Sequence, residues 1–269
     1  MAIKSILFDL DDTLVVEGAA ADAAFLATCE RAYEKHGIDP EALHQSVRYH
    51  ARQLWRASTT ISYCRAIGIS SWEGLWARFL GSDPNLKRLR TWTPTYRREA
   101  WFRALADHGV SDLSFAEELS ATFLLERRAR HTLFSDVEDS LTHLRDIYQL
   151  ALVTNGAPDL QREKIQGTNL VRFFDTILIS GEVGVGKPDC RIFRLVLDAL
   201  AASPPETVMV GDSLTRDILG AQRAGLKGIW LNRSGSDATD QVTPDVQITS
   251  LSQLHKRLLT LDNVNLNHL

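Results

Sequence analysis

The chain has 269 residues, of which 44% are hydrophobic and 24% charged, and its net charge at pH 7 is −4. This length suffices for one large domain or two smaller ones, and the composition is that of a globular protein. Nucleic-acid binding usually needs a basic face, so we expect no nucleic acid among the partners. No apolar run reaches the length of a membrane span, and Asp9 interrupts the apolar residues after Lys4 before a signal peptide can form.

The three cysteines, Cys29, Cys64 and Cys190, are far apart, and none belongs to a C-x-x-C pair. An odd number of separated cysteines indicates reduced thiols, and no cysteine or histidine pair has the spacing of a structural zinc site. We therefore expect a cytoplasmic protein with no membrane partner. The sequence leaves the choice between a monomer and a homodimer open.

In chain order, the first predicted element is a buried strand at about 3–9, which runs directly into Asp9, Asp11 and Asp12. Crowded carboxylates repel one another unless a cation neutralises them. A strand that ends in Asp-x-Asp therefore predicts a divalent metal, a nucleophile or both. The alternative interpretation is that Asp9 and Asp11 only form a turn or a helix cap. Asp12 is better explained as a solvated or capping residue of the turn.

The second part of the chain, residues 17–132, predicts an entirely helical block. Ser114 and Glu117 resemble a capping box that opens one of its helices. The charged run at 126–131 is typical of a solvated helix face, with a hinge or substrate charge as the lesser alternative. Four apolar side chains at helical spacing predict one stripe that packs in a core: Trp72, Leu75, Trp76 and Phe79.

The third part, from about 133, alternates between apolar strands and helices, which indicates a parallel sheet with helices on both faces. We expect an α/β fold, a doubly wound parallel sheet with a Rossmann-like core and an inserted all-helical cap. The core domain is predicted at 1–16 and 133–269 and the cap domain at 17–132, and the tail 261–269 is expected to be loose. The predicted strands are 150–153, 176–179, 207–210, 228–231 and 246–249, and the predicted helices are 137–147, 158–167, 189–202, 215–225 and one from about 251.

Polar residues follow the predicted strands. In a parallel sheet the carboxyl ends of the strands meet at one edge, where ligands bind. We therefore expect one site to be built from Asp9 and Asp11 after the first strand, Thr154, Asn155 and Gly156 after the second, Lys187 one loop after the third, and Gly211, Asp212 and Ser213 after the fourth.

These side chains suit phosphoryl chemistry. The carboxylates of Asp9 and Asp212 can supply oxygen ligands to Mg²⁺, and so can the main-chain carbonyl of Asp11. Thr154 can donate a hydrogen bond to phosphate, and Lys187 can add a fixed positive charge. Asp9 is then the candidate nucleophile. Asp11, two residues on, can protonate the leaving alkoxide and later deprotonate water.

The motifs resemble those of the haloacid dehalogenase superfamily, on its phosphatase branch with a helical cap inserted after the first motif. The resemblance covers about 1–16 and 133–235, and four motifs occur in the family's order and spacing. They are DLDDT at 9–13, VTNG with Thr154, GKP with Lys187, and GDSLTRD with Asp212 and Asp217.

The resemblance implies a magnesium-dependent phosphomonoester hydrolase that acts on a small phosphorylated metabolite through an aspartyl-phosphate. It implies Asp9, Asp11, Thr154 and Lys187 as catalytic residues, and Asp11, Thr154, Asn155, Gly156 and Lys187 as phosphate-binding residues. The implied magnesium ligands are Asp9, Asp11 and Asp212, with Ser213 and Asp217 in support. Asp217 would orient Lys187 or a metal-bound water, or it could simply complement the dipole of its helix.

Three alternatives remain open. A phosphomutase shares nearly every core residue, although its subfamily usually has Gly where Asp12 stands. A 2-haloacid dehalogenase uses the same nucleophile but needs neither a leaving-group acid nor a metal, so Asp11 and Asp212 count against it. A non-catalytic phosphate-binding protein would not need the complete set of acid, hydroxyl and lysine. The sequence does not name the substrate.

Overall fold

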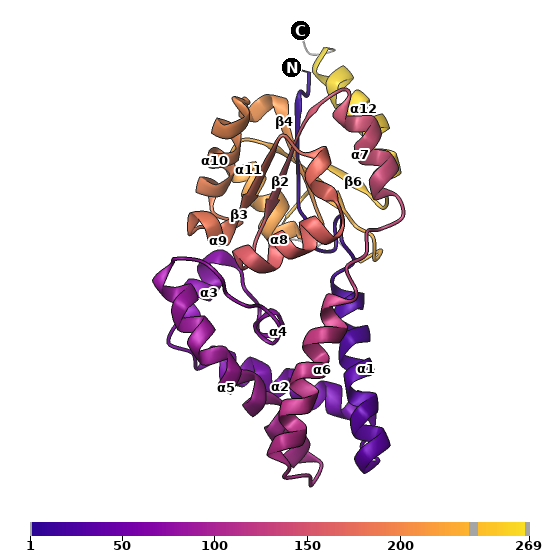
Figure 1. Ribbon diagram of the computed structural model, residues 1–269. Coiled ribbons are helices and arrows are strands. Elements are labelled where there is room, and N and C mark those ends of the chain that lie inside the picture. Colours follow the sequence, from indigo (N-terminus) through magenta and orange to yellow (C-terminus); the bar gives the residue numbers. More distant parts are fainter. Residues whose placement is uncertain (1, 237–241, 267–269) are drawn as a thin grey trace. The chain divides into compact units, whose positions relative to one another are not determined.

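The computed structural model describes residues 2–236 and 242–266, which fall into two compact units (Figure 1). The sheet unit comprises Met1–Val16, Leu133–Asn155 and Lys164–Leu269. The helical unit comprises Glu17–Thr132 and Gly156–Glu163. The sequence did not indicate that the segment Gly156–Glu163 would group with the helices, because it directly follows a strand of the sheet.

The sheet unit is built on six parallel strands in the order β3-β2-β1-β4-β5-β6. Each connection between consecutive strands is long, as parallel pairing requires. This topology confirms the predicted α/β doubly wound fold. The strands are β1 (Ser5–Phe8), β2 (Gln149–Thr154), β3 (Thr176–Ile179), β4 (Thr207–Gly211), β5 (Lys227–Leu231) and β6 (Val246–Ile248).

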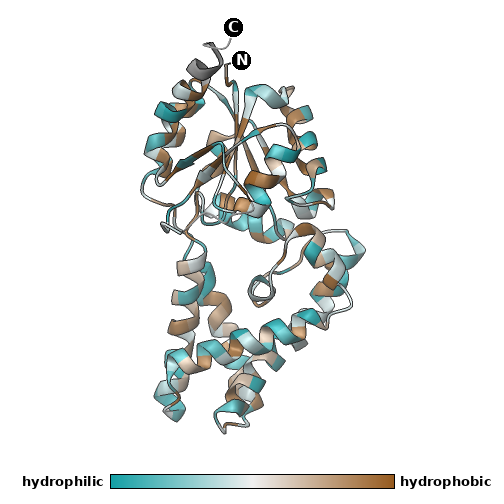
Figure 2. Cartoon of the chain, turned by 180° about the vertical axis from the view of Figure 1, so that it is seen from behind, coloured by the Kyte–Doolittle hydropathy of each residue, from teal (hydrophilic) through white to brown (hydrophobic). Residues whose placement is uncertain are grey.

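Successive side chains of the central strand pack on opposite faces of the sheet. In β1, Ile6 and Phe8 belong to one hydrophobic cluster and Leu7 belongs to another. The first cluster is completed by α7 (Val137–Arg145) and α12 (Leu254–Leu266), and the second by α10 (Cys190–Leu200) and α11 (Leu219–Arg223). Each such buried aliphatic or aromatic side chain contributes about 1.5–3 kcal/mol. Because both faces of the strands are covered, their sequences are continuous apolar runs. In Figure 2 the covering helices alternate between brown and teal because only one side of each meets the sheet.

The helices of the sheet unit follow the predicted order, except that the short helix at Ser180–Val183 was not predicted. The α-helices are α7 (Val137–Arg145), α9 (Ser180–Val183), α10 (Cys190–Leu200), α11 (Leu219–Arg223) and α12 (Leu254–Leu266), and α8 (Pro158–Gly167) is divided between the two units. Shorter turns are η1 (Leu170–Phe173), η2 (Pro204–Glu206), η3 (Leu214–Ile218) and η4 (Leu251–Gln253). The prediction of a loose tail was wrong for 261–266, which continue α12, and 267–269 lie outside the described residues.

The helical unit consists of α1 (Gly18–His36), α2 (Pro40–Arg56), α3 (Ile61–Ile67), α4 (Ser71–Gly74), α5 (Pro84–Asp107), α6 (Leu113–Arg128) and the first part of α8. Its core is rich in aromatic residues: Trp55, Trp76 and Trp101 are buried, and Trp72 and Trp92 pack against the same cluster. The tryptophans therefore serve packing, as predicted. Within residues 2–236 and 242–266, none of the helices has the length and apolarity to cross a membrane.

The predicted apolar stripe packs in the core, with Trp72 only partly buried, but it does not lie on one helix. The helix α4 ends at Gly74, and Phe79 has a left-handed backbone with φ of 52°. Gly74 is required where it stands, because a Cβ there would lie 2.4 Å from the Trp55 ring. The chain turns at this close approach, so Leu75, Trp76 and Phe79 reach the core from irregular backbone.

The prediction of a capping box at Ser114 and Glu117 was also wrong. Helix α6 begins at Leu113, and Asp112 is its cap, accepting a hydrogen bond from the Phe115 amide at 2.9 Å. Ser114 lies inside the first turn and donates its hydroxyl to Asp112 at 2.7 Å. An aspartate that precedes the helix satisfies the first amide groups and favours the helix dipole as well.

The run at 126–131 is not a uniformly solvated face, because Arg127 has no exposed area. Its guanidinium forms an ion pair with the buried carboxylate of Glu17 and lies 4.7 Å from the centre of the Trp76 ring. The residues on either side differ: Arg128 pairs with Glu163 at 2.8 Å, and Arg130 makes a half-buried pair with Glu126. A sequence pattern of charges could not distinguish these three arginines.

We expect Arg127→Met to lower the free energy of unfolding by about 3–5 kcal/mol, because it leaves the Glu17 carboxylate buried without its charge partner. The measurement is urea unfolding of the full chain, followed by far-UV circular dichroism. Arg130→Met is the matched control, since removing a partly exposed i,i+4 pair costs about 0.5 kcal/mol or less. Equal losses in the two variants would contradict the assignment.

Candidate active site

The carboxyl ends of β1, β2 and β4 bring the predicted residues of the sheet unit together. Asp9 directly follows β1, Thr154 is the last residue of β2, and Asp212 directly follows β4. The Asp9 amide donates to the Val210 carbonyl at 3.0 Å, so the β1–β4 pairing continues up to the site. The positions of these three side chains thus follow from the order of the strands.

Lys187 lies between two carboxylates. Its ammonium nitrogen is 2.5 Å from Asp9 Oδ1 and 2.7 Å from Asp217 Oδ1, and only 5% of the residue is exposed. Burial alone would lower the pKa of this ammonium, but Asp217 and Asp9 outweigh it and raise the pKa above 10.5. The two ion pairs therefore favour the charged form of Lys187 at the end of β1.

The loop of Lys187 is held by Asn155. The Lys187 amide donates to Asn155 Oδ1 at 2.8 Å, and Asn155 Nδ2 donates to the Lys187 carbonyl at 2.9 Å. Asn155 was predicted as a phosphate ligand, whereas its side chain here fixes the backbone of the neighbouring loop. Thr154 is almost fully buried, and its hydroxyl lies 3.5 Å from the Asn155 carbonyl.

Gly156 belongs to the helical unit and has a φ of 146°. A Cβ on Gly156 would lie 2.9 Å from the side chain of Gln161, so both its backbone conformation and the space require glycine. The predicted residue therefore has a structural reason for its identity besides the phosphate contact expected from the motif.

Three carboxylates gather at the site. One oxygen each from Asp9, Asp212 and Asp217 lies within 4.8 Å of the others. The sequence predicted Asp9 and Asp212 as a pair, but it did not predict that Asp217 would complete the cluster. Asp217 lies in the π-helical turn η3, and its Oδ2 accepts the Ser213 amide at 3.0 Å. A Cβ on Gly211 would lie 2.4 Å from this oxygen, so glycine there leaves room for the carboxylate.

Ser213 supports the cluster through its backbone. Its amide binds Asp217, while its hydroxyl accepts from the Arg216 amide at 3.3 Å as the cap of η3. Asp217 in turn lies 2.7 Å from the Lys187 ammonium, so that the two form an ion pair.

Thr13 links Asp9 to Asp212 and was missed as a site residue. Its hydroxyl donates to Asp9 Oδ2 at 3.4 Å and accepts the Asp212 amide at 3.1 Å. Arg233 in turn donates to the Thr13 carbonyl at 2.9 Å. The signal for Thr13 was present, because it is the last residue of the DLDDT motif.

Asp11 has a partner that the sequence did not indicate. The Lys164 ammonium lies 2.8 Å from Asp11 Oδ1, and the Lys164 side chain is fully buried. From the sequence, a lysine in the middle of a polar helix is indistinguishable from a surface lysine.

The unusual pKa values of the site follow from burial and crowding. Burial raises the pKa of Asp9 to about 6, although Lys187 lowers it in part, and Asp217 and Asp11 raise it further. Burial, followed by repulsion from Asp9 and Asp217, raises the pKa of Asp212 to about 8. Such carboxylates are costly to hold as anions, and a cation among them removes that cost.

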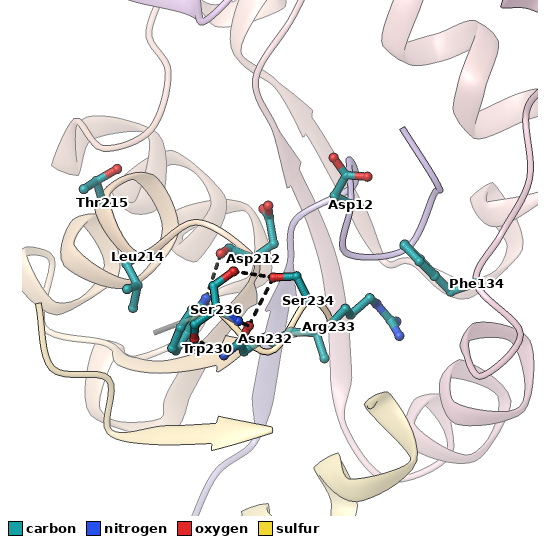
Figure 3. A pocket seen from close by; sticks show the side chains of 11 residues that line it. Asp12, Phe134, Asp212, Leu214, Thr215, Trp230, Asn232, Arg233, Ser234 and Ser236 are labelled. Carbon is teal, nitrogen blue, oxygen red and sulfur yellow. Dashed lines mark hydrogen bonds between the residues drawn. The ribbon is translucent and has the colours of Figure 1, made fainter. Parts of the chain in front are cut away.

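A cavity of about 620 Å³ borders Asp212 on the side of β5 (Figure 3). Its wall combines the apolar faces of Phe134, Leu214 and Trp230 with polar groups of the loop after β5. The Trp230 indole donates to the Asp212 carbonyl at 2.8 Å. This hydrogen bond holds the backbone of Asp212, which is a candidate metal ligand. Asp12 lines this cavity and is not part of the carboxylate cluster.

The sequence matches the haloacid dehalogenase-like hydrolases over residues 3–225. The chain belongs to this family. The resemblance read from its four motifs is thereby confirmed, and this haloacid dehalogenase-like hydrolase is an enzyme of the phosphatase type.

Its relatives support the same conclusion. Phosphoserine phosphatase of Thermus thermophilus is 38% identical over 253 residues, which cover 94% of this chain and 98% of the relative. N-acylneuraminate-9-phosphatase of Rattus norvegicus is 30% identical over 266 residues, which cover 97% and 95%. Among solved structures, the HAD-hydrolase YfnB of Bacillus subtilis superposes with a TM-score of 0.66 at 23% identity, covering 96% of this hydrolase and 99% of that chain, which shows the shared fold.

Proposed function

We propose that the chain is a magnesium-dependent phosphomonoester hydrolase that acts on a small phosphorylated metabolite through an aspartyl-phosphate. One observation supports this most: the buried Asp9 carboxylate lies 2.5 Å from the Lys187 ammonium and within 4.8 Å of the Asp212 and Asp217 oxygens. A nucleophile, a cation for the phosphate and ligands for a metal are thus brought to one strand end.

The donor set fits Mg²⁺. Carboxylate oxygens are hard ligands of the kind that Mg²⁺ prefers. Burial and mutual repulsion raise the pKa values of Asp9 and Asp212, and a bound divalent ion would offset this cost of holding them as anions. Asp9 and Asp212, with the main-chain carbonyl of Asp11, would hold the ion. When bound, Mg²⁺ supplies electrostatic stabilisation of the phosphate charge. The related YfnB of Bacillus subtilis is bound to magnesium in its crystal structure.

In the first step Asp9 attacks phosphorus and the ester P–O bond breaks. Asp11 transfers a proton to the leaving oxygen, so that an alcohol departs instead of an alkoxide. Lys187 and Thr154 bind the transferred phosphoryl group, together with main-chain amides at Asn155 and Gly156. The Asn155 side chain contributes indirectly, because it holds the Lys187 backbone.

In the second step water attacks the aspartyl-phosphate. Asp11 takes a proton from this water, the bond between the Asp9 oxygen and phosphorus breaks, and inorganic phosphate leaves. Asp9 is then a carboxylate again and Asp11 carries the proton for the next cycle. Asp217 keeps Lys187 in place through its ion pair at 2.7 Å.

The alternatives are less well supported. A 2-haloacid dehalogenase needs no leaving-group acid, whereas Asp11 follows the proposed nucleophile by two residues and is paired with Lys164. A non-catalytic phosphate-binding protein has no use for a nucleophile and three clustered carboxylates. A phosphomutase would use the same groups and return the phosphoryl group to a sugar, so only its product distinguishes it.

The proposed substrate is a small phosphorylated molecule, and the substrates of the relatives are the first compounds to assay. Their names state that they act on phosphoserine, N-acylneuraminate 9-phosphate, pyrimidine 5'-nucleotides and glyceraldehyde 3-phosphate. The test is phosphate release from these compounds and other phosphorylated metabolites with Mg²⁺, ranked by kcat/KM. We expect at least one to be hydrolysed with full phosphate release. Failure with every ester, or transfer of the phosphoryl group to a second sugar instead of water, would reject the proposal.

A further inference from the structure

Helix α8 places a lysine where an apolar residue would be expected. Lys164 has no exposed area, and the neighbouring Leu160 and Ile165 of the same helix are also buried. Lysine is almost never fully buried unless its charge is paired, because removing an ammonium from water is costly. The position therefore needs an explanation beyond helix packing.

Lys164 forms an ion pair with Asp11, the carboxylate that we propose as general acid and base. The ammonium nitrogen lies 2.8 Å from Asp11 Oδ1, between residues 153 positions apart in the chain. The lysine side chain is 0% exposed, while 24% of the Asp11 side chain reaches solvent. One end of the pair is thus buried in the protein interior, and the other is partly exposed to solvent.

A purely stabilising role does not account for this pair. Replacing a buried ion pair with apolar side chains of similar volume is often neutral or even stabilising. Its value lies instead in the single orientation that it imposes on Asp11. Proton transfer requires hydrogen-bonding reach and alignment, so a freely rotating carboxylate in the loop after β1 would be a poor acid.

We propose that Lys164 is a positioning residue for Asp11, an inference that rests on the proposed phosphatase function. The hydrogen bond from Lys164 anchors Oδ1, which keeps an acceptor lone pair whether or not the carboxyl group is protonated. Oδ2 carries the proton that moves to the leaving oxygen as the ester P–O bond breaks. In the second step a proton from water returns to Oδ2, and Lys164 neither gains nor loses one.

The test compares two esters that differ in their need for an acid. Phosphoserine, or the best alkyl ester found in the metabolite panel, has a poor alkoxide leaving group, whereas p-nitrophenyl phosphate releases a stable phenolate. Lys164→Met keeps the length of the side chain and removes its charge. We expect the single-turnover rate of alcohol release from the alkyl ester to fall by at least about 10-fold and that of p-nitrophenolate release by less than about 3-fold, because a single turnover isolates the first step from the later water attack that also uses Asp11. Lys164→Arg should restore part of the alkyl activity.

Two variants calibrate the result. Asp11→Asn should show the same selective loss on the alkyl ester, and Lys256→Met, on an exposed position of α12, should leave both rates unchanged. A simple structural defect in Lys164→Met would lower both rates equally, and that outcome, or no change in either rate, overturns the inference. If the wild-type protein and Asp9→Asn hydrolyse the esters at the same rate, the proposed function itself is wrong.

Discussion

Asp9→Asn is expected to lower kcat for phosphate release by about 10⁴-fold or more while the protein stays folded. The amide has nearly the shape of the carboxylate but cannot attack phosphorus. The cluster should tolerate the change, because burial and repulsion already raise the pKa of Asp9 to about 6, and Lys187 keeps its pair with Asp217. The measurement is steady-state hydrolysis of the best ester, with circular dichroism to verify the fold.

Asp12→Asn is the matched control for this prediction. Asp12 is in the same loop, is partly exposed and has a left-handed backbone with φ of 56°, which asparagine tolerates well. Because Asp12 lies outside the carboxylate cluster, we expect kcat in this variant to stay within about 3-fold of wild type, since most surface changes away from the chemistry are small. Comparable activity in Asp9→Asn and wild type would remove Asp9 from its role as nucleophile.

Metal removal is expected to have the second largest effect. With excess chelator the rate should fall to the uncatalysed background, and added Mg²⁺ should restore it, because Asp9 and Asp212 otherwise repel the phosphate that Lys187 attracts. Asp212→Asn should raise the Mg²⁺ concentration needed for half-maximal rate. Full activity in chelator would contradict the assignment of the cluster as a metal site.

The same cluster should make the metal-free protein less stable as the pH rises. Burial and repulsion raise the pKa of Asp212 from 3.8 to about 8 in the folded state, so between these values the folded protein holds a proton that the unfolded chain has lost. Stability then falls with increasing pH, and the loss is complete above about pH 8. In Asp212→Asn the side chain at position 212 does not titrate, so it adds no such pH dependence to the stability.

The measurement is the thermal midpoint of wild type and Asp212→Asn in chelator from pH 4 to pH 9. The difference between the two proteins isolates Asp212 from the other titrating groups, and each kcal/mol lost lowers the midpoint by about 2–4 °C. We expect the thermal midpoint of Asp212→Asn to rise relative to that of wild type as the pH rises. Mg²⁺ should make this difference smaller, because it binds the ionised carboxylates of the wild type. A constant difference across this range would show that Asp212 is not under electrostatic strain.

Several site residues could be predicted because their positions follow from strand order alone. Apolar runs alternating with helices indicate a parallel sheet, and in such a sheet the residues after each strand meet at one edge. Asp9, Thr154 and Asp212 were found in this way, and the structure places each of them at the end of its strand. Their burial and their short distances to one another could not be read from the pattern.

The failures share a physical cause. The charge of Arg127 looked like that of its solvated neighbours, and nothing in the sequence drew attention to Lys164, yet both are fully buried against acids far away in the chain. Whether a charged side chain is solvated depends on which distant carboxylate the fold brings to it. Local patterns contain no information about such pairs.

By itself the sequence therefore determined the α/β class, the order of most elements, the family motifs and the edge of the sheet where the predicted site residues meet. These features depend on periodicity and on the few residues that follow each strand. Only the tertiary structure decided that Asp217 joins Asp9 and Asp212, that Thr13 bridges two of them, and that Lys164 anchors Asp11. These pairings depend on distances of a few ångströms between segments far apart in the chain, and such distances exist only after the sheet and its covering helices have packed.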